Sequence, residues 1–398
     1  MSGTIQRADT IDSSGYPLGF KVRQGSARPG VLGGQACIDE FRVELRAMGG
    51  HQKEAVVSEG ETGSAFRAVS DEGPALKGTD LAPIPLGYMN AGLQADMHNR
   101  FMQLATIRGA KVDALEMELL NSYLFEGSFL RGDGRGSAEA PRYKLKVTSS
   151  APADKLLGLA RSALDASPLA AMCRASLENT FAFYVNGRRR PVVFLPSSGR
   201  TDAGDPLKTW KSVPAPLAGA DDLPGMVAKL ADVKPAVTTP IDPAATQRRG
   251  IKIHGFGRWV DGTTESEVWG SGSRFGLKSD ERMDVGRAPS GLSIAAMGVA
   301  FCLSTQFLRY AEHHKMNLRA LRIVQYSPFE LTGSAAQGTL VARPHPMDTH
   351  MFLHGDESDE RMEKLLSMAQ NTCYLHALLH EPLEPVFELH LNGTPVTV

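Results

Sequence analysis

The strongest constraint on the fold is an internal repeat with a constant separation of 206 residues. Over 82–101 and 288–307, five of 20 positions are identical without a gap. Near the ends of the repeat, 177–187 and 383–393 share five of 11 positions. The matching segments keep their order along the chain, as copies of one supersecondary unit do. We therefore expect two modules of the same fold in one chain.

A proline-rich stretch separates the two copies. Nine of the 24 prolines fall between residues 188 and 249, and proline removes a backbone donor and restricts φ. Residues 188–249 are therefore predicted to be a linker, with one short helix at 226–230. The Gly-rich residues 1–40 are predicted to be an N-terminal extension, which leaves one module at 41–187 and another at 250–398.

Both modules are expected to have the same order of elements, β–α–β–α–β. Proline precedes the first helix of each module, as is common at helix starts, and alternating apolar residues indicate the strands. The expected elements are 41–45, 86–106, 114–119, 154–166 and 182–185 in the first module, and 251–275, 292–312, 321–324, 359–380 and 387–391 in the second. The predicted fold class is therefore α+β, with one module used twice.

Composition argues against several classes of protein. Lys and Arg total 43 against 44 for Asp and Glu, so the basic excess of a nucleic-acid-binding protein is missing. Residues 1–15 lack the apolar segment of a signal peptide, and the apolar run 291–308 is interrupted by polar residues, which indicates a buried helix rather than a membrane span. Four cysteines without a CxxC pair indicate free thiols in a reducing cytoplasm.

Two cysteines distinguish the second copy from the first. Cys302 lies on the expected helix 292–312, where the first copy has Asp96. Cys373 lies on the expected helix 359–380, where the first copy has Ser167. A cysteine needed only for packing would exchange more naturally with a small apolar residue than with aspartate. The exchange at Cys302 therefore favours a functional site.

The second copy resembles the OsmC/Ohr superfamily of organic hydroperoxide reductases and osmotically induced proteins. The resemblance rests on Ala288-Pro289 … Ala300-Phe301-Cys302, followed by Leu365-Leu366 … Ala369 … Cys373. It implies that Cys302 is the peroxidatic thiol and Cys373 the resolving thiol. It also implies that Arg258, 44 residues before Cys302, holds the thiolate.

The resemblance further implies an arrangement for the two copies. Members of this superfamily form intertwined homodimers, so a tandem chain is expected to be a single-chain pseudo-dimer around central apolar helices, which could pair further into a homo-oligomer. Sites in such dimers lie at the interface, so Asp96 and His98 of the first copy are possible contributors. Trp259, beside Arg258, is expected either to line an apolar pocket or to pack in a strand.

The sequence departs from the family pattern at three places. The stretch Ser290-Gly291-Leu292 lacks the glutamate that partners the family arginine, and Tyr374 replaces the proline that commonly follows the second cysteine. The first copy has neither thiol, so it cannot perform a dithiol cycle.

Three functions are compatible with these residues. The first is a thiol peroxidase, in which Cys302 reduces an organic hydroperoxide, Cys373 closes a disulfide and an external dithiol restores both thiols. The second is a hydrolase or lyase for a small apolar carbonyl compound, with Cys302 activated by His98 or His376. The third is a non-catalytic module that binds a hydrophobic ligand or a partner protein.

No cofactor, metal, nucleic acid or membrane is expected as a partner. The glycine-rich fragments lack nucleotide-binding spacing. Cys373, His376 and His380 share one face of the expected helix 359–380, but a packed or partly exposed face explains them without a metal.

Overall fold

Two long buried helices form the centre of the protein. The computed structural model describes residues 9–193, 195–232, 249–270, 272–284 and 286–396. Helices α2 (Pro85–Ile107) and α6 (Gly291–His313) have 23 residues each and coincide closely with the predicted helices. The α6 helix has the length and hydropathy of a membrane span, but its most apolar 18-residue window is buried entirely inside the protein.

Helices α2 and α6 contact each other through glycine and alanine. A Cβ atom added at Gly92 would lie 2.7 Å from the Cβ atom of Ala295 and 2.8 Å from the carbonyl oxygen of Gly291. One added at Gly298 would lie 3.0 Å from the backbone nitrogen of Met89. Because real Cβ atoms do not come this close, the contact requires glycine and brings the two helix backbones together.

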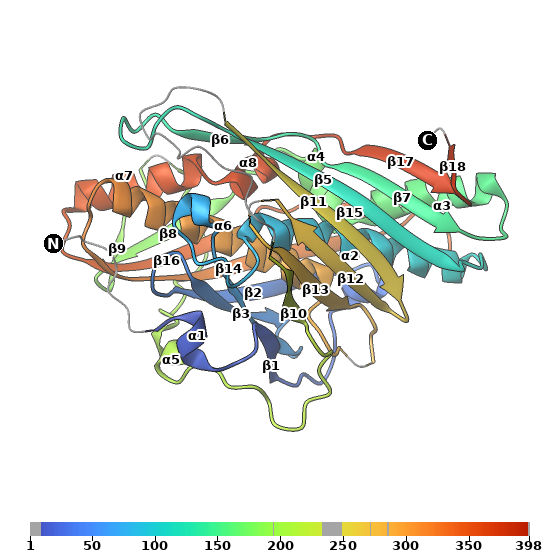
Figure 1. The fold of residues 1–398 in the computed structure, drawn as a ribbon, viewed down its shortest axis with the longest axis horizontal. Coiled ribbons are helices and arrows are strands. Elements are labelled where there is room, and N and C mark those ends of the chain that lie inside the picture. Colours follow the sequence, from blue (N-terminus) through green and yellow to red (C-terminus); the bar gives the residue numbers. More distant parts are fainter. Residues whose placement is uncertain (1–8, 194, 233–248, 271, 285, 397–398) are drawn as a thin grey trace.

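Two nine-stranded sheets enclose these helices. Sheet A has the order β1 (Gly19–Arg23), β4 (Ala65–Ser70), β3 (Lys53–Glu59), β2 (Ile38–Ala47), β14 (Leu318–Thr332), β16 (Asp348–Gly355), β8 (Thr180–Val185) and β9 (Arg188–Arg190), with β15 (Val341–Arg343) paired to β14. Sheet B has the order β10 (Val227–Ala231), β13 (Arg274–Asp280), β12 (Thr263–Trp269), β11 (Arg249–Val260), β5 (Ala114–Glu126), β7 (Arg142–Thr148), β17 (Val386–Leu391) and β18 (Thr394–Val396), with β6 (Arg135–Ala138) paired to β5. Helix α2 packs on β5, β11 and β12 of sheet B, and α6 packs on β2, β3 and β14 of sheet A (Figure 1).

Each sheet combines strands from both copies of the repeat. In sheet A, β14 and β16 of the second copy lie between β2 and β8 of the first. In sheet B, β5 and β7 of the first copy lie between β11 and β17 of the second. Strand pairing is antiparallel except where β16 meets β8 and where β17 meets β7. The same order of corresponding strands therefore occurs twice, and neither copy completes a sheet alone.

The second helix predicted for each copy differs from the structure. The expected helix 359–380 is divided into α7 (Asp359–Asn371) and α8 (Tyr374–His380), and Cys373 is the N-cap of α8. The first copy is divided in the same way into α3 (Ala153–Ala166) and α4 (Pro168–Arg174), with Ser167 as the N-cap of α4. Both N-cap residues have extended backbone dihedrals, and this breaks the helix.

The boundaries predicted for the extension and the linker were also wrong in part. Residues 226–230, predicted as a helix, belong largely to β10, because they pair with the edge strand β13 of sheet B. Residues 1–40 are not a separate extension over their described part, since β1 pairs with β4 and β2 begins at Ile38. A four-residue helix, α1 (Ile11–Ser14), lies in the same part of the chain.

The described part of the predicted linker, 188–193 and 195–232, contacts sheet A. Both carboxylate oxygens of Asp205 accept hydrogen bonds from Arg322, at 2.5 and 2.7 Å. The helix α5 (Leu207–Lys211) places Trp210 in a buried cluster with Val56 and Ala65. These contacts order a proline-rich segment that has little regular structure of its own.

The helix contact gives a direct test of the fold. Gly92→Ala should lower the free energy of unfolding by about 1–3 kcal/mol, because the new methyl group meets the backbone of α6. Gly158→Ala in α3 is the matched control, since a Cβ atom there has no neighbour within 4 Å, and it should stabilise the protein by up to about 1 kcal/mol. Urea denaturation measures both. Equal stability of Gly92→Ala and the wild type would contradict the contact.

Candidate functional site

The structure brings Cys302 and Cys373 together inside the protein. Cys302 lies on α6 and is 2% exposed, while Cys373 is fully buried at the start of α8. Burial raises the pKa of Cys373 well above its ordinary value, and a side-chain hydrogen bond with Cys302 raises it further. Both cysteines are free thiols. The two thiols therefore interact in the interior of the protein.

His376 contacts the second thiol. Its Nδ1 atom lies 3.2 Å from the Sγ atom of Cys373, and its ring packs against Phe181 with centroids 5.5 Å apart. Burial lowers the pKa of His376 to about 4, so the imidazole is neutral at neutral pH. Its Nε2 atom has no hydrogen-bond partner among the described residues. A neutral imidazole beside a protonated thiol can accept a proton from it.

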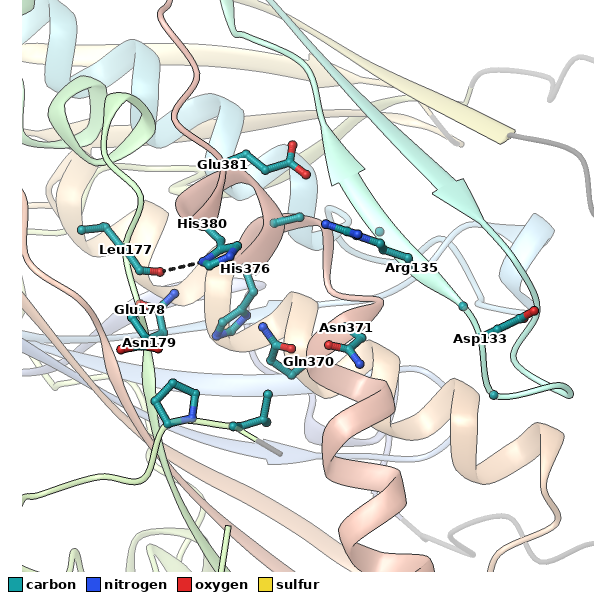
Figure 2. Close-up of a pocket in the computed structure, with 16 residues that line it drawn as sticks. Asp133, Arg135, Leu177, Glu178, Asn179, Gln370, Asn371, His376, His380 and Glu381 are labelled. Carbon is teal, nitrogen blue, oxygen red and sulfur yellow. Dashed lines mark hydrogen bonds between the residues drawn. The ribbon is translucent and has the colours of Figure 1, made fainter. Parts of the chain in front are cut away.

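A cavity of about 460 Å³ reaches His376 from the surface. Figure 2 shows the side chains of His376, Gln370 and Asn371 facing this space. Arg135 and Glu381 line it as well. Polar and charged side chains predominate here, whereas the thiols lie among apolar and aromatic ones. The lining of this cavity therefore differs from the apolar surface expected around a small apolar substrate.

A pair of buried charged side chains from the first copy contacts α6 at Thr305, three residues after Cys302. Lys53 Nζ lies 3.1 Å from Glu72 Oε1, which also accepts a 2.6 Å hydrogen bond from Thr305 of α6. Burial raises the pKa of Tyr374, the residue after Cys373; Arg309 lowers it, and Cys302 and Glu72 raise it. A buried carboxylate thus lies near the site although Ser290-Gly291-Leu292 contains none.

Tyr123 is a second site residue that the sequence interpretation missed. It lies on β5, is 1% exposed, and packs its ring 5.7 Å from that of Tyr374. Neither Lys53, Glu72 nor Tyr123 is close in sequence to a cysteine, so motif spacing could not identify them. The aligned copies do contain one signal, because Phe329 occupies the position of Tyr123 in the other copy.

In the first copy, Asp96 and Ser167 form a corresponding pair. Ser167 donates a 2.6 Å hydrogen bond to Asp96, and the backbone of Leu169 donates another at 3.1 Å. Burial raises the pKa of Asp96, whereas the charge of Arg100 and the hydrogen bond from Ser167 lower it. The Asp96 carboxylate is thus engaged within its own copy, by Ser167 and the backbone of Leu169.

His98 is also engaged elsewhere. Its Nδ1 atom lies 3.3 Å from the hydroxyl of Thr264 on β12, and burial lowers the pKa of His98 to about 3. The structure therefore pairs His98 with sheet B and assigns the contact with a cysteine to His376.

The structure places the Arg258 side chain at the surface, where it pairs with Glu265 and not with a thiol. Its side chain is 59% exposed and bonds the carboxylate of Glu265 at 2.9 and 3.0 Å across β11 and β12. Strand alternation explains this, because the neighbouring Gly257 faces α2 and turns Arg258 to the outside. Trp259 faces inward, is half-buried and packs against the main core. Of the two expectations for Trp259, this is packing within a strand.

The described residues contain no group of three or more His, Cys, Asp or Glu side chains arranged to hold a metal ion. His380, one of the residues considered for such a site, has its Nδ1 atom 3.3 Å from the carbonyl oxygen of Leu177. Figure 2 shows this contact as a dashed line.

Comparison with known proteins bears on the segment that contains both thiols. Residues 284–387 match the family model described as OsmC-like protein, which confirms the resemblance predicted for the second copy. A solved structure of an OsmC-like hydroperoxide resistance protein from Jannaschia sp. CCS1 aligns with 37% of this chain and 96% of its own, at 20% identity and a TM-score of 0.27. A comparison with curated proteins found no match.

The buried imidazole predicts a loss of stability in acid. The pKa of His376 is about 4 in the folded protein and about 6.5 in an unfolded chain, so unfolding takes up a proton between these values. The contribution of His376 to the free energy of unfolding is fully present above pH 6.5 and is lost as the pH falls. His376→Gln should reduce the loss of unfolding free energy between pH 7 and pH 5 by about 2 kcal/mol. Urea denaturation at both pH values measures it, and an identical loss in both chains would refute the neutral imidazole.

The position of Arg258 makes a negative prediction. Arg258→Gln should leave the reactivity of the thiols unchanged within about twofold and alter stability by less than about 1 kcal/mol, because an exposed ion pair contributes little. Stopped-flow measurement of thiol oxidation gives the reactivity. A tenfold loss would restore the role implied by the family resemblance.

Proposed function

We propose that this chain, whose residues 284–387 form an OsmC-like domain, is a thiol peroxidase for organic hydroperoxides. The observation that supports this most directly is the interaction between the side chains of Cys302 and Cys373, which are both buried. Two thiols in contact inside a protein can form a disulfide after one of them is oxidised.

The proposed reaction has three balanced steps. The Cys302 thiolate attacks one peroxide oxygen; an S–O bond forms, the O–O bond breaks, and the alkoxide takes up the proton that the thiol released. The product is an alcohol and a sulfenic acid on Cys302. The Cys373 thiol then attacks the Cys302 sulfur, and water leaves as the disulfide forms. An external dithiol reduces the disulfide by two exchange reactions.

His376 has a part in the second step. The Cys373 thiol must lose its proton as it attacks, and burial makes this unfavourable. The Nδ1 atom of His376, at 3.2 Å, can accept that proton. His376 also lines the cavity, so an external dithiol would approach the disulfide from the Cys373 side.

We infer that 41–187 and 250–398 are two OsmC-like modules that form a pseudo-dimer within one chain. The mixed sheets support this inference. Strands β14 and β16 of the second module lie within sheet A, and β5 and β7 of the first module lie within sheet B. The contacts of Tyr123 and Glu72, both of the first module, with Tyr374 and Thr305 of the second support it as well. The first module would then act as the partner subunit of the thiol site.

The two cysteines should have distinct phenotypes. Cys302→Ala should abolish turnover of cumene hydroperoxide with a dithiol reductant, because the attacking sulfur is gone. Cys373→Ser should retain the first oxidation and accumulate a sulfenic acid on Cys302, since the resolving thiol is missing. Dimedone labelling followed by mass spectrometry detects this acid.

Cys37→Ser is the control for that experiment, because Cys37 lies beside Asp39 and away from the buried pair; it should behave as the wild type. Turnover in Cys302→Ala, or the absence of any disulfide between Cys302 and Cys373 under oxidant, would contradict the peroxidase proposal.

One observation favours a second candidate function. A cysteine with a neutral histidine at 3.2 Å is the pair needed for nucleophilic attack on a carbonyl. In this structure the pair is Cys373 with His376, rather than Cys302 with His98, and it adjoins the cavity. An acyl adduct trapped on Cys373 would support a hydrolase or lyase, whereas an adduct confined to Cys302 would not.

A further inference from the structure

Tyr123 presents a buried hydroxyl that the fold leaves unused. The residue lies on β5 of sheet B, and its hydroxyl has no hydrogen-bond partner among the described residues. A buried hydroxyl without a partner costs free energy, so a protein rarely keeps one without a compensating interaction. A phenylalanine would fill the same space without that cost.

Tyr123 lies beside the segment that carries Cys373, because its ring centroid is 5.7 Å from that of Tyr374. After burial, the causes that raise the pKa of Tyr123 are the nearby Cys302, Cys173 and Cys373, with no acidic or basic side chain among them. The ring packs against Tyr374, directly after Cys373. The strand β6 closes the site, because Gly136 lies against the backbone of Thr372 and the ring of Tyr374.

The two copies of the repeat separate the role of the ring from that of the hydroxyl. Phe329 on β14 occupies the position that corresponds to Tyr123. It is equally buried and packs against Phe41 with centroids 5.2 Å apart. Both copies therefore have a buried aromatic ring at this position. Only the ring on β5, that of Tyr123, carries a hydroxyl.

We propose that the Tyr123 hydroxyl is the hydrogen-bond donor to the reacting group at Cys302. It would donate to the sulfur when Cys302 is a thiolate, and to the oxygen that becomes bonded to that sulfur. The hydroxyl keeps its proton throughout, so it stabilises charge without acting as an acid. The step with peroxide rests on the proposed function, whereas the interaction with the thiolate does not.

Such a donor matters here because both thiols are buried. Charge that develops on sulfur or oxygen in an apolar interior needs a fixed donor, and donors of this kind are a large contribution to catalysis. Arg258, which the family resemblance assigned to this task, is on the surface. Tyr123 supplies a neutral donor in its place, and no desolvated cation is required.

The test removes only the hydroxyl. In Tyr123→Phe, the midpoint of the Cys302 thiolate titration should move to higher pH by about one unit, equivalent to a tenfold change in ionisation. Ultraviolet absorbance of the thiolate measures it, with each chain compared with its own Cys302→Ser version. The rate of sulfenic acid formation with cumene hydroperoxide should fall by about tenfold, as expected for loss of one hydrogen bond to a charged group.

Tyr143→Phe is the matched control. Tyr143 lies on the neighbouring strand β7 and is also buried, and the causes that raise its pKa include Cys173 and Asp96 but neither Cys302 nor Cys373. It should leave both the titration and the rate unchanged. Incorporation of 3-fluorotyrosine at position 123 is a second measurement, and its more acidic hydroxyl should shift the titration to lower pH.

The outcomes separate this proposal from the proposed function. A titration midpoint in Tyr123→Phe equal to that of the wild type and of Tyr143→Phe would overturn the role of Tyr123, whatever the peroxide experiments show. A shifted midpoint in a protein that consumes no peroxide would support the hydrogen bond and overturn the peroxidase function.

Discussion

The contact between α2 and α6 is the interaction on which the rest of the structure depends. Gly92, Gly291 and Gly298 remove the side chains that would separate the helix backbones. Each helix covers a different sheet, so their contact joins the two sheets into one core. It also places strands of one copy beside the helix of the other. The thiol site is therefore built from both copies, with α6 and α8 on one side and β5 on the other.

The two copies use one geometry for two different pairs of side chains. In each, a short helix begins at a polar or thiol N-cap that bonds a residue on the long helix: Ser167 with Asp96, and Cys373 with Cys302. The oxygen pair satisfies buried polar groups and stabilises the fold. The sulfur pair forms weaker hydrogen bonds and can change its covalent state. Replacement of oxygen by sulfur at corresponding positions thus distinguishes the two pairs.

Burial determines how the thiol site can function. It keeps Cys373 protonated and His376 neutral, and it leaves the hydroxyl of Tyr123 without a hydrogen-bond partner among the described residues. Neutral donors and acceptors are the groups that such an interior accommodates at least cost. The polar cavity beside His376 is where this interior meets solvent. The Cys373 side of the pair is therefore the side that adjoins this cavity.

The sequence by itself determined the repeat, the two long helices and the identity of the sulfur pair, because hydrophobic period and residue identity are local properties. It did not determine that β14 and β16 enter sheet A, or that Arg258 faces outward, because strand partners and strand faces depend on the whole sheet. The break before Cys373 was missed since a helix-compatible pattern continues across it. Only the tertiary structure brought Tyr123, Glu72 and His376 to the thiols, because these contacts join residues far apart along the chain or require an N-cap that no local pattern specifies.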